Sequence, residues 1–457
     1  MASSSHSMIH RGGEEEDDDV EVNVDVGAGA DEPQPQPQPK PKPKPKPRLK
    51  PTTSSKVPTH PFKSLSTREP SFSDLTFSPA RFSTSSPPCS PTPLHHKPLS
   101  FNNHTSHRCI SSTLNKDRQI LSIALSGPLV YTGSQASTIR IWKLPDFSEV
   151  AQLKANKAAG AVRSLAVSDD RLFAGYADCK IRVWRRSWDG LGPHVRLATI
   201  PSIADYLRNY ITGKDHKNMM KQHLGAISSL AINAADDLLY SASVDTTVKV
   251  WRISKLKCIE TIRAHTEPIN AIVVGGDGVF YTASDDATVR VWRRHSYGGG
   301  GDRPHSLAVT LSTDSSPVKA LALTADGMVL YGGCTDGYVH CWLKGWLSGH
   351  MHYGGPLQGH RHAVLCLACV SNYLVSGSAD LTCRVWVRDG EGLQTCIAVL
   401  EGHMGPVRCV AAFVPDGLDG CMVCTASLDG TLKIWRVTSS GNVSLGPTQG
   451  GRPTFQF

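Results

Sequence analysis

Histidine, hydroxyl and aspartate side chains, the three groups of a hydrolytic triad, recur together in the second half of the sequence. Four segments each have a histidine, a serine or threonine, an aspartate four residues after the hydroxyl and a tryptophan six residues after the aspartate. These residues are His223, Ser241, Asp245 and Trp251; His265, Thr282, Asp286 and Trp292; His360, Ser376, Asp380 and Trp386; and His403, Thr425, Asp429 and Trp435. One such set would favour a hydrolase. Because the set occurs four times without a nucleophile-elbow motif, it indicates a repeated structural device, and we predict that the protein is not an enzyme.

Two pairs of cysteines have the spacing of metal ligands: Cys366 with Cys369, and Cys421 with Cys424. Both pairs lie in apolar, strand-like segments, where residues three apart point to opposite faces. A zinc ion needs ligands that converge on one point. We therefore expect the 13 cysteines of the chain to be free thiols, and we predict no metal and no cofactor.

A strand pattern that ends in tryptophan recurs seven times and would position these side chains. The tryptophans are separated by 41 to 67 residues and are Trp142, Trp184, Trp251, Trp292, Trp342, Trp386 and Trp435. Two further strand patterns precede each tryptophan, as in AVLCLAC and YLVSGSAD. These segments resemble the WD40 family, in which a repeat of about 40–45 residues forms one four-stranded blade. The resemblance implies an all-β fold, a seven-bladed WD40 β-propeller over residues 108–440.

The same resemblance implies a role for the repeated polar side chains. In WD40 blades the histidine, hydroxyl, aspartate and tryptophan form a buried hydrogen-bonded network, which is costly to break when one member is lost. Six of the seven repeats have the aspartate, and the first has Ala136 instead. The repeats of Asp178 and Asp336 lack the histidine and the hydroxyl. We therefore expect removal of either aspartate to cost less stability than removal of Asp245 or Asp380.

The ends of the repeat region indicate how the ring closes. CISSTLNK at 109–116 is similar to two predicted outer strands, CIETIRAH at 258–265 and CIAVLEGH at 396–403. Residues 108–114 are therefore predicted to supply the fourth strand of the last blade, which removes exposed sheet edges. The longest spacer, 187–222, is predicted to be an enlarged loop with a short amphipathic helix at 203–212, capped by Ser202 and Asp205.

The first 107 residues differ in composition from the repeats. An acidic stretch, the run PQPQPQPKPKPKPKPRLKP and a Ser/Thr/Pro-rich segment follow one another, without any tryptophan or tyrosine. Such a sequence cannot bury enough apolar surface to offset the entropy of ordering. We predict a long disordered N-terminal region, 1–107, and a flexible tail, 441–457. Four residues that precede proline are candidates for phosphorylation: Ser78, Ser86, Ser90 and Thr92.

Charge and hydropathy limit the classes of partner. No apolar run approaches the roughly 18 residues of a membrane span, and the first residues lack a secretory signal, so we expect an intracellular protein without membrane partners. Residues 1–107 carry 12 basic and 12 acidic residues, so the net charge of +8 lies on 108–457. This excess of positive charge is moderate, and the sequence lacks the aromatic and basic signature of RNA-binding modules. Both observations argue against nucleic acid as a partner.

The resemblance to WD40 proteins also indicates a partner-binding face. In that family the residues three and five after the histidine position, and the residue before the turn aspartate, point to the narrow top face. In this sequence these positions are Arg163, Ser228, Asn270, Asp285, Lys319 and Arg408. Three cations against one acid favour an acidic or phosphorylated protein segment. The alternative is a set of solvated rim charges.

Some segments are similar to a narrower group of plant WD40 proteins, those of the JINGUBANG type. They include RLATIPSIADYLRNY and LEGHMGPVRCVAA. The similarity implies a cytoplasmic and nuclear regulator that acts through protein contacts and is associated with pollen germination. We therefore predict a non-catalytic protein-interaction scaffold or adaptor. The alternative is a substrate receptor of a cullin-based ubiquitin ligase, although the acidic residue that typically follows the blade tryptophan of such receptors is missing from every repeat.

Overall fold

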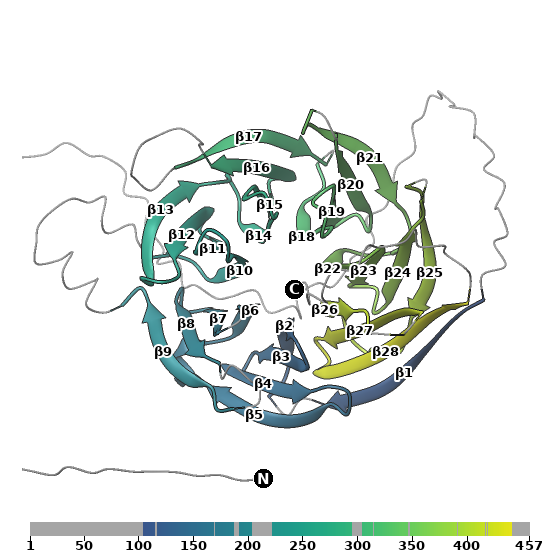
Figure 1. The fold of residues 1–457 in the computed structure, drawn as a ribbon, viewed down its shortest axis with the longest axis horizontal. Coiled ribbons are helices and arrows are strands. Elements are labelled where there is room, and N and C mark those ends of the chain that lie inside the picture. The colour runs from purple at the N-terminus through teal and green to yellow at the C-terminus, as the bar shows by residue number, and fades with distance from the viewer. Residues whose placement is uncertain are drawn as a thin grey trace, which may run out of the picture. The chain divides into compact units, whose positions relative to one another are not determined.

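A computed structural model describes residues 104–440, except 115–116, 169, 187–191, 203–221, 295–303, 314, 346–347, 391, 416 and 418. These residues form seven four-stranded antiparallel sheets, arranged as blades around a ring (Figure 1). The prediction of an all-β, seven-bladed propeller is confirmed. The predicted helix at 203–212, residues 1–103 and the tail from 441 to 457 lie outside the described residues.

The first four blades follow one another along the chain, and the strands of each blade run in chain order from the innermost to the outermost. Blade 1 contains β2 (Ile120–Ser126), β3 (Leu129–Ser134), β4 (Thr138–Lys143) and β5 (Ser148–Lys154). Blade 2 contains β6 (Val162–Val167), β7 (Arg171–Tyr176), β8 (Ile181–Arg185) and β9 (Val195–Ile200). Blade 3 contains β10 (Ile227–Asn233), β11 (Leu238–Ser243), β12 (Thr247–Arg252) and β13 (Lys257–Arg263). Blade 4 contains β14 (Ile269–Val274), β15 (Phe280–Ser284), β16 (Thr288–Arg294) and β17 (His305–Ser312).

The remaining blades repeat this order, except that the outermost strand of the last blade comes from the other end of the repeat region. Blade 5 contains β18 (Val318–Leu323), β19 (Val329–Cys334), β20 (Val339–Lys344) and β21 (Met351–Leu357). Blade 6 contains β22 (Val364–Val370), β23 (Tyr373–Ser378), β24 (Cys383–Arg388) and β25 (Gln394–Leu400). Blade 7 contains β26 (Val407–Phe413), β27 (Gly420–Ser427), β28 (Thr431–Ser440) and β1 (His104–Leu114). A 3-10 turn, η2 (Lys157–Ala159), precedes blade 2.

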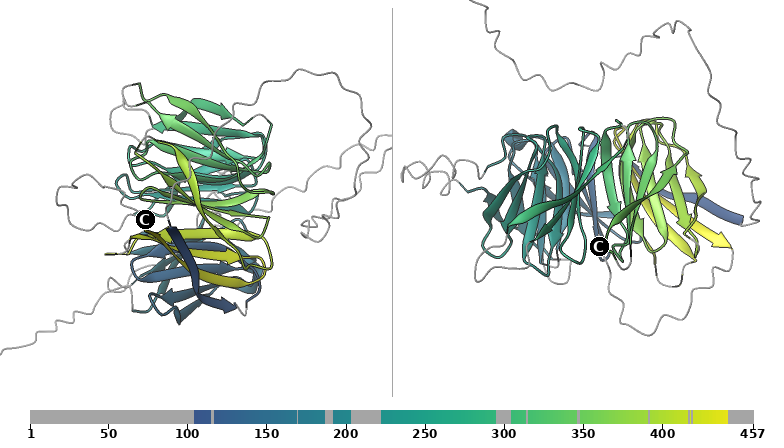
Figure 2. Two further views of the ribbon diagram at one scale, coloured as in Figure 1. Left: turned by 90° about the vertical axis from the view of Figure 1, so that its right-hand side faces the viewer. Right: turned by 90° about the horizontal axis from the view of Figure 1, so that it is seen from above.

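The core lies between neighbouring blades. The second strand of each blade is almost entirely buried, as in β3 and β11, whereas outermost strands such as β5 are largely exposed. Seen from the side in Figure 2, adjacent sheets stack face to face. Leu129 and Tyr131 of blade 1 share one apolar cluster with Val162 and Trp184 of blade 2. Each blade therefore buries both of its faces only when it has a neighbour on each side.

Strand β1 closes the ring by pairing with β28 along its whole length, from His104 opposite Ser440 to Leu114 opposite Thr431. The strand begins four residues before the boundary expected at 107/108. The pairing with β28 extends over these residues, and the hydroxyl of Thr105 donates a hydrogen bond to the carbonyl of Ile397 in β25 at 2.9 Å. Blade 7 therefore has no unpaired edge next to β28. Within the described ranges, no helix is long and apolar enough to cross a membrane.

Candidate functional site

The repeated polar side chains meet in a chain of hydrogen bonds inside each complete blade. In blade 3, Nε1 of Trp251 donates to Oγ of Ser241 at 2.9 Å, and that oxygen lies 2.7 Å from Nε2 of His223. The other ring nitrogen, Nδ1, lies 3.0 Å from Oδ2 of Asp245. The chain therefore links the third strand of the blade, its second strand, the loop before the blade and the turn between the second and third strands.

Blades 4, 6 and 7 repeat this arrangement. The distance from the tryptophan Nε1 to the hydroxyl oxygen is 2.9 to 3.0 Å, and the distance from that oxygen to the histidine Nε2 is 2.7 to 2.8 Å. In blades 4 and 6 the histidine Nδ1 lies 2.8 and 2.9 Å from the aspartate. In blade 7, His403 Nδ1 lies 3.4 Å from Asp429 and 2.9 Å from the hydroxyl of Thr431. The structure thus brings together all four predicted sets.

The geometry resembles a hydrolytic triad, but the hydroxyl cannot act as a nucleophile. Ser241, Thr282, Ser376 and Thr425 have no solvent-exposed surface. Each of these oxygens also accepts a hydrogen bond from the tryptophan behind it. A substrate carbonyl would have to approach within about 3.5 Å of the attacking oxygen. The sets therefore stabilise each blade by linking its strands, its turn and the loop before it.

Protonation follows from burial and hydrogen bonding. Burial lowers the pKa of His223 below its usual value, although Asp245 opposes this shift. Burial by itself would raise the pKa of Asp245, but hydrogen bonds from His223, Thr247 and the backbone N–H of Leu224 outweigh it and hold that pKa well below its usual value. At neutral pH the network of blade 3 thus contains a neutral imidazole and an ionised carboxylate.

A fifth member of the network was missed by the sequence analysis. A threonine two residues after each aspartate donates its hydroxyl to the aspartate Oδ1 at 2.6 to 2.7 Å: Thr247, Thr288, Thr382 and Thr431. The backbone N–H of each threonine donates to the same oxygen. The signal was present in the sequence, because an Asp-x-Thr triplet occurs in the four complete repeats.

Blades 1 and 2 use a buried arginine on the third strand, which binds the turn aspartate in blade 2 and carboxylates outside that turn in blade 1. In blade 2 the guanidinium of Arg182 binds both carboxylate oxygens of Asp178, at 3.0 and 2.7 Å, and stacks 4.2 Å from the ring of Tyr176. In blade 1, where Ala136 replaces the aspartate, Arg140 binds Asp117 at 2.7 Å and also Glu149. Both guanidiniums are almost fully buried. A buried arginine–carboxylate pair therefore stands where other blades have the histidine–aspartate pair.

The predicted partner-binding residues share a backbone feature. A β-bulge interrupts the start of the innermost strand of every blade, and five of the six predicted residues occupy the bulge position. Around the ring these positions are Leu121, Arg163, Ser228, Asn270, Lys319, Leu365 and Arg408. A bulge re-aims the side chain that it carries. Because all blades repeat one strand order around the ring, the starts of the seven innermost strands, which carry these residues, lie at one end of the channel.

The sixth predicted residue, Asp285, gathers two of the others. Its carboxylate forms a very short ion pair with Lys319 and accepts a hydrogen bond from the amide of Asn270 at 2.7 Å. The Asn270 amide also donates to the carbonyl of Val318 at 2.9 Å. Blades 4 and 5 are therefore joined at the rim, and the charge of Lys319 is balanced. Arg408 makes a weaker contact, 3.4 Å from the carbonyl of Leu365 in blade 6.

Comparison with protein families decides the assignment. The model described as "WD domain, G-beta repeat" matches residues 147–185, 215–252, 256–293, 306–342, 353–387 and 394–436. The chain belongs to the WD40 family. Each matched segment beyond the second begins in or near an outermost strand and ends at or just after the tryptophan of the next blade. The first three strands of blade 1, which lack the histidine and the aspartate, are not matched.

Curated WD40 relatives come from several kingdoms. Telomerase protein component 1 of Rattus norvegicus is 29% identical over 220 residues, which cover 45% of this chain and 8% of that protein. Kinesin-like protein KIF21B of Homo sapiens is 23% identical over 332 residues, covering 72% of this chain and 17% of that protein. An F-box/WD-40 repeat-containing protein of Arabidopsis thaliana is 31% identical over 139 residues, covering 30% and 23%. The chain thus spans less than a quarter of the length of each of these relatives.

The two cysteine pairs are part of the apolar packing of the WD40 propeller. Cys366 packs between blades 6 and 7, whereas Cys369 packs between blades 5 and 6. Cys421 and Cys424 are divided in the same way between two core clusters. Burial raises the pKa of Cys421 and Cys424 to about 12, which keeps both thiols protonated. Neither pair converges on a common point.

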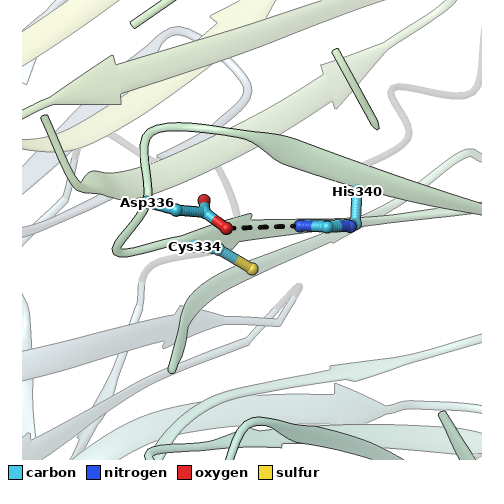
Figure 3. Close-up of side chains that lie close together, drawn as sticks. All are labelled: Cys334, Asp336 and His340. Atoms are coloured by element: carbon cyan, nitrogen blue, oxygen red, sulfur yellow. Dashed lines mark ion pairs between the residues drawn. The ribbon is translucent and has the colours of Figure 1, made fainter. Parts of the chain in front are cut away.

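Blade 5 contains a group of possible metal ligands that the sequence analysis missed. One ligand atom from each of Cys334, Asp336 and His340 lies within 4.8 Å of the other two (Figure 3). Cys334 ends β19, Asp336 lies in the following turn, and His340 belongs to β20. The sequence signal is a cysteine two residues before the turn aspartate and a histidine four residues after it.

Proposed function

We propose that this WD40 protein is a non-catalytic scaffold that holds protein partners at the end of the channel where the bulge residues lie. The observation that carries the proposal is the repeated bulge, which occurs at the start of the innermost strand in every blade. WD40 propellers generally bind other proteins. A rigid ring with fastened turns can hold a partner without reorganising, which lowers the entropic cost of binding.

Charge on this rim favours an acidic or phosphorylated segment as the partner. Arg163 in blade 2 and Arg408 in blade 7 occupy the bulge positions on either side of blade 1. Arginine binds carboxylate and phosphate groups through charge-assisted, bidentate hydrogen bonds. Lys319, on the far side of the ring, is already paired with Asp285. We place the anionic contact over blades 7, 1 and 2, because two arginines occupy the bulge positions of blades 7 and 2.

The test compares two rim variants of the full chain. Arg163→Gln with Arg408→Gln should reduce capture of tissue partners at least tenfold in quantitative affinity purification. Lys319→Gln, the matched control, removes a cation that Asp285 already neutralises and should change capture by less than twofold. Both variants should melt within a few degrees of the wild type. If the double variant retains the same partners in the same amounts, this rim is not the binding face.

A substrate receptor of a cullin-based ubiquitin ligase is the second candidate. The similarity to an F-box/WD-40 repeat-containing protein favours it. The residues after the blade tryptophans argue against it, because such receptors typically have an acidic residue there and none of these is acidic. They are Lys143, Arg185, Arg252, Arg293, Leu343, Val387 and Arg436. Co-purification of a cullin with the wild-type chain would favour this candidate over a simple adaptor.

The finer biological role is proposed from resemblance alone. The segments similar to JINGUBANG-type proteins suggest a plant regulator that is cytoplasmic and nuclear and takes part in pollen germination or growth. Imaging of the tagged full chain in germinating pollen tests both parts of this proposal. Exclusion from both compartments, or absence from pollen, would contradict it.

A further inference from the structure

Blade 5 differs from the complete blades at two positions beside the turn aspartate. Blades 3, 4, 6 and 7 have a serine two residues before the aspartate and a lysine or arginine four residues after it. The serine donates to a carbonyl of the preceding loop and accepts the aspartate N–H, as Ser243 does with Gly225 and Asp245. In blade 5 these positions are Cys334 and His340. Both substitutions exchange a structural group for a ligand that zinc prefers.

The side chain of His340 is prepared for a ligand on one ring nitrogen. It is 9% exposed, and its Nε2 is buried without a hydrogen-bond partner among the described residues. The nearest acid, Oδ2 of Asp336, lies 3.6 Å away, beyond hydrogen-bond range. Nδ1 lies 2.8 Å from the hydroxyl of Tyr353 on β21. A metal-binding histidine commonly donates its other N–H to an oxygen, which fixes the tautomer and leaves Nε2 as a lone pair.

The separation of Asp336 and His340 suits two ligands of one small ion, and the sulfur of Cys334 lies nearby. Zinc binds sulfur at about 2.3 Å and nitrogen or oxygen at about 2.0 to 2.2 Å in a tetrahedral arrangement. Ligand atoms on such a tetrahedron are separated by roughly 3.3 to 3.7 Å. The gap between Asp336 and His340 is within this range, and all three ligand atoms lie within 4.8 Å of one another. Figure 3 shows the carboxylate and the imidazole directed at each other, with the sulfur beside them.

We propose that Cys334, Asp336 and His340 bind one zinc ion. The thiol of Cys334 loses its proton to solvent on binding, so the site holds a thiolate, a carboxylate and a neutral imidazole. The Asp336 side chain is 31% exposed, which gives the ion a path from solvent and leaves the fourth position to water. The ion would tie the end of β19 and its turn to β20. These are two of the elements that the histidine network joins in the complete blades, whereas blade 5 has Gly332 at the hydroxyl position.

Metal titration of the full chain tests the proposal. The protein is treated with a chelator under reducing conditions and titrated with Co²⁺, whose thiolate complexes absorb in the near ultraviolet. We expect one equivalent of Co²⁺ to produce a thiolate band that Zn²⁺ abolishes by displacement. Cys334→Ser and His340→Lys install the residues of blade 3 and should lose the band. Tyr353→Phe keeps the ligands and should weaken Zn²⁺ binding about 10- to 100-fold.

Controls separate this site from adventitious binding. Cys109→Ser removes an exposed thiol on β1 and should leave the band and the stoichiometry unchanged. If the wild type gives no displaceable thiolate band, or if Cys334→Ser keeps it, the proposal is wrong and the cluster is a buried thiol beside an ion pair. Should Cys334→Ser fail to fold, Asp336→Asn at the exposed turn provides the decision. Unchanged Zn²⁺ affinity in that variant would also overturn the site.

Discussion

Blades 3 and 2 of this WD40 propeller solve one structural problem with different chemistry. Both bury a tryptophan at the same place on the third strand, and both must hold the turn between the second and third strands. Blade 3 does so with a neutral histidine, a hydroxyl and an ionised aspartate. Blade 2 has Ala174 at the hydroxyl position and holds Asp178 with Arg182. The position of the tryptophan thus depends on apolar packing between blades. The polar groups that hold the turn can differ from blade to blade.

The kind of polar interaction in a blade changes how much stability its turn aspartate contributes. In blade 3 the aspartate is one of several members, and its loss leaves neutral donors unpaired. In blade 2 the aspartate neutralises a guanidinium that is 6% exposed. A buried cation without its partner is more costly than a neutral donor without its acceptor. The pair reverses the expectation from the sequence that removal of Asp178 costs less stability than removal of Asp245.

The largest expected effect comes from removing β1, the strand that closes the ring. It tests whether the hydrogen-bond network alone can hold blade 7. Blade 7 has a complete network, yet its outermost strand comes from the beginning of the repeat region. Deletion of residues 1–115 should expose the edge of β28 and cause aggregation or a melting point at least 10 °C lower, because a whole strand and its apolar contacts are lost. Deletion of residues 1–100 is the control and should melt like the full chain. If both truncations melt alike, the network suffices to hold blade 7 without β1.

Removal of the turn aspartate should distinguish the three kinds of blade. Asp245→Ala should lower the free energy of unfolding by about 1–3 kcal/mol, because several donors lose one acceptor. Asp178→Ala should cost at least as much, since it leaves Arg182 buried and unpaired. Asp336→Ala, measured in chelator, should cost less than about 1 kcal/mol, because this side chain is partly exposed. Urea unfolding measures all three, and equal losses would contradict the comparison.

Grafting the hydroxyl into two incomplete blades should have opposite effects. Ala174→Ser in blade 2 offers Trp184 an acceptor and can donate to the backbone carbonyl of Arg182, so it should stabilise by about 0.5–1.5 kcal/mol. Gly332→Ser in blade 5 should destabilise by about 1–3 kcal/mol. A Cβ at Gly332 would lie 2.9 Å from Cζ3 of Trp342, so the ring occupies the space that the side chain needs. Thermal melts measure both effects. If the two melting temperatures shift in the same direction, the predicted difference in packing between blades 2 and 5 is wrong.

The smallest expected effect is the pH dependence that the buried histidines of the complete blades add to the free energy of unfolding. Burial lowers the pKa of His265 in the fold, although Asp286 opposes the shift. Below the usual pKa of about 6.5 the unfolded chain therefore binds a proton that the folded chain does not, and the free energy of unfolding falls as the pH falls. His265→Gln removes this contribution.

Urea unfolding at pH 7.5, 6.5 and 5.5 measures the effect as a difference in slope between the wild type and His265→Gln. The variant should be less stable at every pH but lose stability less steeply towards pH 5.5. The difference should be a fraction of the roughly 1.4 kcal/mol per pH unit that one whole proton would give. A steeper slope in the variant would mean that the imidazole is already protonated in the fold.

The family, the number of blades and the members of the repeated polar sets could all be found in the sequence. Each depends on a local pattern that occurs several times, and repetition separates a structural device from a catalytic site. The period of the tryptophans determined the blade count, and the Asp-x-Thr triplet was present as well, although its role was not recognised. Apolar alternation likewise placed the cysteine pairs on opposite faces of their strands.

Tertiary structure alone decided which charges meet. Lys319 and Asp285 belong to different blades and are 34 residues apart, so no local pattern shows that one cancels the other. Asp178 and Asp336 have equivalent positions in the sequence, yet only Asp178 faces a buried arginine. The thiol, carboxylate and imidazole of blade 5 converge because a turn and two strand ends bring them together. Electrostatic energies depend on distance and burial across the fold, and these quantities exist only once the blades have packed.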